Sequence, residues 1–141
     1  MTRIDFYINA SNKAEVARKL AVKALSAGQY VLVFTLNVKL ARELDSAFWQ
    51  NPPRSFVPHA LCNDRLASDT PILIGHDPAR LLRSDVVINL DDALPEWFSR
   101  FDRLLDIVGQ DPIDKELARL RFRSLKDKGY SLDVHDLEAS K

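Results

Sequence analysis

The strongest constraint on the fold is an almost uninterrupted apolar run at residues 30–36, which reads YVLVFTL. A strand with one solvated face alternates apolar and polar side chains, and this run leaves no polar face. Strands of this kind are usually buried on both sides, as in a parallel sheet that is covered by helices. The run therefore predicts a layered α/β domain.

Segments with strand and helix patterns alternate along the rest of the chain. Short apolar runs indicate the strands, and apolar side chains at helical spacing indicate the helices. The expected strands are residues 4–8, 30–36, 71–74 and 85–90, and the expected helices are residues 13–27, 38–48, 96–108 and 111–128. This alternation predicts an α/β fold with a mostly parallel central sheet flanked by helices.

The length of 141 residues predicts one domain over residues 1–141. Its C-terminal tail, about residues 130–141, either folds back through its apolar residues or packs loosely. The single cysteine, Cys62, allows no disulfide within the chain, and no apolar run approaches the length of a membrane span. We therefore expect a cytoplasmic protein that does not enter a membrane.

Charge and glycine usage argue against several classes of function. Lysine and arginine number 20, as do aspartate and glutamate, so the net charge is zero, unlike that of most dedicated nucleic-acid binders. The chain has only four glycines and no glycine-rich phosphate loop. His59 and Cys62 have the spacing of half a metal site, but no second pair accompanies them. We expect no catalytic residue, metal or cofactor. The alternative is a small nucleotide-binding enzyme that uses the Asp91–Asp92 loop.

The helix expected over residues 111–128 carries a row of cations. Lys115, Arg119, Arg123 and Lys126 fall within about 80° of one another on a helical wheel, and Phe122 lies at the edge of that row. The row could be an ordinary solvated face. It also suits a short acidic peptide with an apolar end, because arginine holds carboxylates and the ring contacts an apolar side chain. A nucleic-acid backbone is a second candidate ligand.

Aromatic and proline residues gather between residues 44 and 59, LDSAFWQNPPRSFVPH. The prolines prevent one long helix across this segment. Trp49 and Phe56 therefore lie at a helix end and on the loop that follows. They either fold onto the core or form a docking surface, since tryptophan and phenylalanine are frequent binding anchors.

Together these segments resemble the chi subunit of bacterial DNA polymerase III holoenzyme. The matching residues are FY at 6–7, GQYVLV at 28–33, LD at 44–45 with FW at 48–49, SFVPH at 55–59, PILI at 71–74, VINL at 87–90, and LAR, RFR and GY at 117–119, 121–123 and 129–130. No single segment is decisive, but their order along the chain is specific. The resemblance implies a Rossmann-like fold and a non-catalytic replication adaptor within a DNA-directed DNA polymerase complex.

The resemblance also implies two partners. The adaptor would join the clamp loader, through its psi subunit, to the acidic C-terminal tail of single-stranded DNA-binding protein. DNA would be contacted only indirectly or weakly, in the cytoplasm at the nucleoid-associated replisome. The residues implied for the tail site are Lys115, Arg119, Phe122 and Val108, with Arg123 and Lys126 beside them. A tyrosine is common in the family where this chain has Phe122.

The psi-binding surface implied by the resemblance falls on the aromatic–proline segment. Its residues would be Trp49 and Phe56, supported by Val57 and Pro58. A helicase-like partner is associated with the same surface in some bacteria, so the two proteins would exclude each other there.

Overall fold

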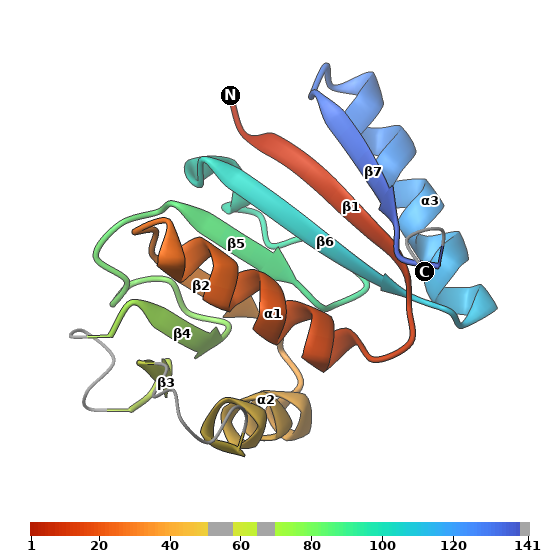
Figure 1. Ribbon diagram of the computed structural model, residues 1–141. Helices are drawn as coiled ribbons and strands as arrows, with labels where there is room; N and C mark the ends of the chain where they lie inside the picture. The colour runs from red at the N-terminus through yellow and green to blue at the C-terminus, as the bar shows by residue number, and fades with distance from the viewer. Residues whose placement is uncertain (51–57, 65–69, 139–141) are drawn as a thin grey trace.

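The structure is a computed structural model of the chain, and it describes residues 1–50, 58–64 and 70–138 (Figure 1). Within these residues seven strands form one sheet, in the order β3-β4-β2-β5-β6-β1-β7, and every neighbouring pair is parallel. The strands are β1 (Arg3–Ala10), β2 (Val31–Phe34), β3 (His59–Leu61), β4 (Ile72–Gly75), β5 (Val86–Asn89), β6 (Arg103–Gly109) and β7 (Leu132–Asp136). The prediction of a mostly parallel α/β sheet is confirmed.

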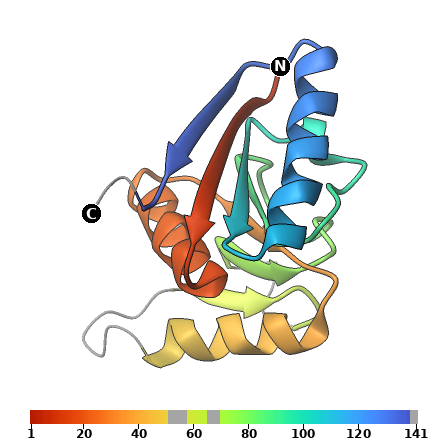
Figure 2. The same cartoon turned by 90° about the vertical axis from the view of Figure 1, so that its right-hand side faces the viewer.

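Helices cover both faces of this sheet. The helices are α1 (Lys13–Ser26), α2 (Val38–Gln50) and α3 (Pro112–Asp127). Side chains of α1 and α2 share one apolar core, and those of α3 pack into a second core on the opposite face. Figure 2 shows this three-layer arrangement edge-on, with the sheet between α1 and α3. None of the helices in the described part of the chain is both long and apolar enough to cross a membrane.

The central strands explain why residues 30–36 are so apolar. All four residues of β2 are fully or almost fully buried, and the four residues of β5 beside it are buried as well. Each strand has neighbours on both edges and helices or loops above and below, so no position faces water. The strand predicted at residues 30–36 is confirmed, with β2 occupying its centre.

The helix predicted over residues 96–108 is wrong. A short 3-10 helix, η2 (Phe98–Arg100), is followed by strand β6 (Arg103–Gly109). The apolar side chains of this segment match a helical face, but its second half, LLDIV, is also a short run that is apolar except for Asp106. Pairing with β1 on one edge and β5 on the other decides the conformation, and such long-range pairing is not visible in local periodicity.

Two short strands were not assigned from the sequence. β3 follows the aromatic–proline segment and pairs with β4 at one edge of the sheet. β7 comes from the tail and pairs with β1 at the other edge, so residues 132–136 of the tail fold back onto the sheet. Residues 139–141 lie outside the described part of the chain.

The crossover from β6 through α3 to β7 places the candidate site. β7 lies on the far side of β1 from β6, so the chain must pass over β1 to reach it. Figures 1 and 2 show α3 running along the face of β1 and β7. The crossover therefore places α3 next to the edge strand β7.

Candidate peptide-binding pocket

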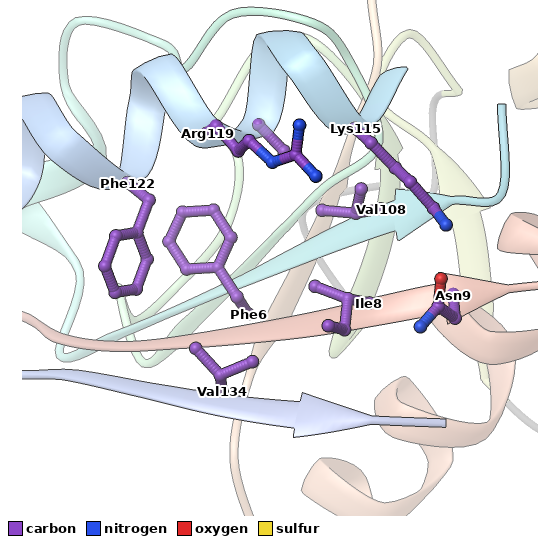
Figure 3. Close-up of a pocket in the computed structure, with 9 residues that line it drawn as sticks. Phe6, Ile8, Asn9, Val108, Lys115, Arg119, Phe122 and Val134 are labelled. Atoms are coloured by element: carbon purple, nitrogen blue, oxygen red, sulfur yellow. The ribbon is translucent and has the colours of Figure 1, made fainter. Parts of the chain in front are cut away.

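A cavity of about 280 Å³ lies between α3 and the strands β6, β1 and β7 (Figure 3). Its lining residues come from four elements that are far apart in the sequence. They are Phe6, Ile8 and Asn9 of β1, Val108 of β6, Lys115, Ala118, Arg119 and Phe122 of α3, and Val134 of β7. The cavity is therefore a product of the tertiary fold.

Four residues named from the sequence meet in this cavity. Lys115, Arg119 and Phe122 project from one side of α3, and Val108 lies at the end of β6 beneath them. The spacings of four and three residues between the α3 members place them on one face of a helix. Arg123 and Lys126 are exposed on α3 but do not line the cavity.

The walls of the cavity are apolar. Phe6 and Phe122 pack edge to face, with ring centroids 5.4 Å apart. Val108 is almost completely buried beneath the cavity, whereas Val134 on the edge strand is 50% exposed. An apolar ligand side chain that enters here would cover exposed carbon on β7 while contacting two aromatic rings.

Two cationic side chains, Lys115 and Arg119, also line the cavity. Lys115 has no acidic partner among the residues that the structure describes. Arg119 forms an ion pair with Glu116, at 3.3 Å between Nη1 and Oε2, with both side chains largely exposed. A pair this exposed stabilises a helix by only about 0–1 kcal/mol. Arg119 is therefore available to an anionic ligand at little cost.

Local capping sets the start of α3. Asp111 is the N-cap and accepts a hydrogen bond from the Ile113 N–H at 2.7 Å, and Pro112 occupies the first turn. Asp114 accepts from the Gly109 N–H at 2.6 Å and lies 3.4 Å from the Lys13 ammonium. These contacts tie the first turn of α3 to β6 and α1.

A buried ion pair holds the middle of α3 to the sheet. Arg121 donates to both oxygens of Asp106 in β6, at 2.8 and 3.1 Å, and to the Asp92 carbonyl at 2.6 Å. Arg121 therefore contacts both a carboxylate and a backbone carbonyl. Burial raises the pKa of Asp106, and the Arg121 guanidinium opposes that rise. The bonds from Arg121 to β6 fix the rotation of α3 about its own axis. In this rotation Lys115 and Arg119 line the cavity.

Most of the expected psi surface lies outside the described residues. Nothing is described of the Trp49 side chain or of Phe56 and Val57. Pro58 is half-buried directly before β3. This surface stays a prediction from the sequence.

The Asp91–Asp92 loop lends no support to a nucleotide site. Both carboxylate oxygens of Asp91 accept hydrogen bonds at 2.7 Å, one from the Thr35 hydroxyl and one from the Leu36 N–H. Asp91 therefore fixes the turn between β2 and α2. No group of three or more metal-ligating side chains occurs in the part of the chain that the structure describes.

His59 and Cys62 do not act as a base and a nucleophile together. The His59 ring stacks on Phe48 at 4.9 Å, and its Nε2 lies 3.2 Å from Asp45. Cys62 packs against the opposite core, and burial raises the pKa of its thiol. A raised pKa disfavours the nucleophilic thiolate.

Comparison with known proteins identifies the family. The family described as "DNA polymerase III chi subunit, HolC" matches residues 1–133. The chain belongs to this family. It is 30% identical to DNA polymerase III subunit chi of Pseudomonas aeruginosa over 141 residues, covering 97% of this chain and 98% of that protein. It is 33% identical to the Haemophilus influenzae subunit, covering 94% and 96%. Family membership makes it an accessory subunit of a replicative DNA polymerase.

The fold itself has wider relatives. The Hef helicase domain of Pyrococcus furiosus superimposes with a TM-score of 0.58 at 12% identity, covering 78% of this chain and 28% of that one. Identity this low shows a shared α/β fold of the Rossmann-like type and nothing about activity.

Five lining residues were not singled out for the site from the sequence. Four of them, Phe6, Ile8, Asn9 and Val134, lie on β1 and β7, whose pairing depends on contacts about 128 residues apart in sequence. The fifth, Ala118, lies about 60° from Lys115 on a helical wheel of α3, so a wheel would have indicated it.

Proposed function

We propose that this subunit is a non-catalytic adaptor that tethers the clamp loader to single-stranded DNA-binding protein. One surface binds the psi subunit of the clamp loader, and the cavity beside α3 binds the acidic C-terminal tail of the DNA-binding protein. Holding two partners at once raises their effective concentration, so each contact can be weak.

The observation that carries the proposal is the pairing of cations with apolar walls in a single cavity. Arg119 offers forked donors for a terminal carboxylate, and Lys115 attracts the acidic residues that precede it. The apolar end of the tail enters between Phe122, Val108 and Val134. A volume of about 280 Å³ suits one or two side chains rather than a folded partner.

The two proposed surfaces lie on different layers of the protein. α3 covers one face of the sheet, whereas α2, whose C-terminal end carries Trp49, covers the other (Figure 2). This separation supports simultaneous binding of the two partners. A helicase-like partner at the psi surface would instead compete with psi.

Titration of a labelled peptide by fluorescence anisotropy tests the tail site. The probe has an acidic stretch and a Pro-Phe terminus with a free carboxylate. We expect saturable binding that Arg119→Ala weakens by at least about tenfold, because a charge-assisted hydrogen bond to a carboxylate is lost. Arg42→Ala, which removes an exposed arginine from α2, is the matched control and leaves the affinity unchanged.

Graded effects on α3 sharpen this test. Lys115→Ala is expected to weaken binding less than Arg119→Ala, and Arg123→Ala less again, because Arg123 acts only through long-range charge. Equal affinity of Arg119→Ala and wild type, or equal binding of a peptide with an amidated C-terminus, would refute the tail site.

A pull-down with psi tests the second surface. Trp49→Ala should reduce psi binding through loss of an aromatic anchor and leave tail binding intact. Loss of both activities would indicate a folding defect rather than a docking surface.

A further inference from the structure

The end of β1 contains an irregularity that faces the cavity. Between Tyr7 and Ala10 the register with β6 shifts by one residue, which is a β-bulge. Asn9 within this bulge has a φ of 62°, in the left-handed region that few residues other than glycine and asparagine adopt. Bulges often occur beside functional sites, where they redirect a side chain. Here the bulge turns Asn9 toward the cavity, which it lines.

The orientation of the Asn9 amide is fixed by chemistry. Its Nδ2 donates a hydrogen bond to Asp136 Oδ1 at 2.9 Å. A carboxylate only accepts hydrogen bonds, so the amide nitrogen must face Asp136. The side-chain oxygen then faces the other way, and Figure 3 shows it on the side of Asn9 nearer the end of Lys115.

This oxygen lacks a hydrogen-bond donor. Asn9 Oδ1 is buried and accepts no hydrogen bond from the described residues. On the facing side, the Lys115 ammonium has no acidic partner in the described part of the chain. The cavity thus contains an unused acceptor and an unused cationic donor that do not satisfy each other. Buried acceptors without donors are rare in native proteins, which suggests that a ligand completes this one.

A ligand that satisfies both groups must carry an acceptor and an N–H close together. The last residue of a peptide has both, since its carboxylate, which Lys115 can share with Arg119, is one carbon away from its backbone N–H. A phosphodiester or a fatty acid offers acceptors only. We propose that Asn9 is a specificity-determining residue that accepts a hydrogen bond from the terminal backbone N–H of the bound peptide. This inference rests on the proposed tail-binding function.

Access to Asn9 Oδ1 requires a small rearrangement, because the atom is shielded in the unoccupied protein. Lys115 lines the same cavity as Asn9 and is its longest flexible side chain besides Arg119. A turn of its ammonium toward an incoming carboxylate is the rearrangement that we expect to accompany binding at Asn9. Lysine makes this movement easily, since its four-carbon stem has several rotatable bonds.

A double-mutant cycle between protein and ligand tests the hydrogen bond. The first probe is the acidic Pro-Phe peptide, and the second replaces its last amide N–H with an ester oxygen. The protein variant is Asn9→Gly, because glycine tolerates the positive φ and should preserve the fold. We expect the ester to weaken wild-type binding by about three- to tenfold and Asn9→Gly to weaken peptide binding similarly. Asn9→Gly should bind the two probes equally.

The outcomes separate this inference from the proposed function. Equal loss on ester substitution in wild type and Asn9→Gly, or no loss in wild type, overturns the role of Asn9 while leaving the tail site standing. No saturable binding of the peptide by wild type overturns both. Thermal melting of Asn9→Gly within a few degrees of wild type confirms that the comparison is between folded proteins.

Discussion

Replacing Arg121 with methionine should severely destabilise the fold, although the residue touches no proposed ligand. Arg121 is 8% exposed and donates three hydrogen bonds, two to Asp106 and one to the Asp92 carbonyl. Without it, the one hydrogen bond to Asp106 that remains among the described residues is a long contact of 3.4 Å from Asn89. Breaking a buried ion pair on one side costs about 3–5 kcal/mol, because a charge remains without a partner. The free energy of unfolding of a whole domain is only about 5–15 kcal/mol.

The effect should depend on pH in a defined direction. In Arg121→Met the pKa of Asp106, which burial already raises, rises further above its unfolded value. A carboxyl with a raised folded pKa destabilises the protein above that pKa, and the penalty disappears as the pH falls toward the unfolded pKa. The deficit relative to wild type should therefore be smaller at pH 5 than at pH 7.5.

Urea denaturation followed by circular dichroism measures this deficit at both pH values. The double variant Arg121→Met, Asp106→Asn removes the unpaired charge and should recover roughly half of the lost free energy. A deficit below about 1 kcal/mol at pH 7.5, or no recovery in the double variant, would refute the idea that this pair anchors α3.

Three further outcomes are expected. Burial raises the pKa of Asp5, but hydrogen bonds from Arg103 and His135 outweigh it and hold that pKa below its ordinary value of 3.8. The Asp5 carboxylate contributes its full stabilisation above its unfolded-state pKa and loses it as the pH falls through its folded-state pKa. Asp5→Asn should therefore reduce the decline of the urea midpoint at acid pH. Gly129→Ala places a side chain at φ +90° with no atom within 4 Å, so it should cost about 1–2 kcal/mol of backbone strain in the same denaturation assay. Binding of the acidic peptide should weaken steadily as the salt concentration rises from about 50 to about 500 mM, because dissolved ions screen the attraction between opposite charges. An affinity that does not change with salt would contradict a cationic site.

The residues of α3 show how far sequence reasoning reaches into the site. A helical wheel places Lys115, Arg119 and Phe122 on one face, and in the structure these three line one cavity. The wheel also groups Arg123 and Lys126 with them, although these two lie outside the cavity. A wheel gives angles around one helix and contains no information on which neighbouring elements close a pocket against it.

The segment around β6 shows where local patterns fail. Residues 96–108 fit a helical face and also contain a buried strand, and only pairing with β1 and β5 distinguishes the two. In the same way, β7 is assigned by its pairing with β1 rather than by its own sequence, in which Asp133 and Asp136 are poor strand formers.

By itself, the sequence determined the α/β class, most of the helices and strands, the cationic face of α3 and the family. These properties depend on the order of residue types and on periodicity over a few turns, which are local. Only the tertiary structure decided the strand order, the bulge that turns Asn9, and the joining of α3 to Phe6 and Val134 in one cavity. Such contacts unite residues that lie from about ten to more than a hundred positions apart, and the free energy of packing the whole chain selects them.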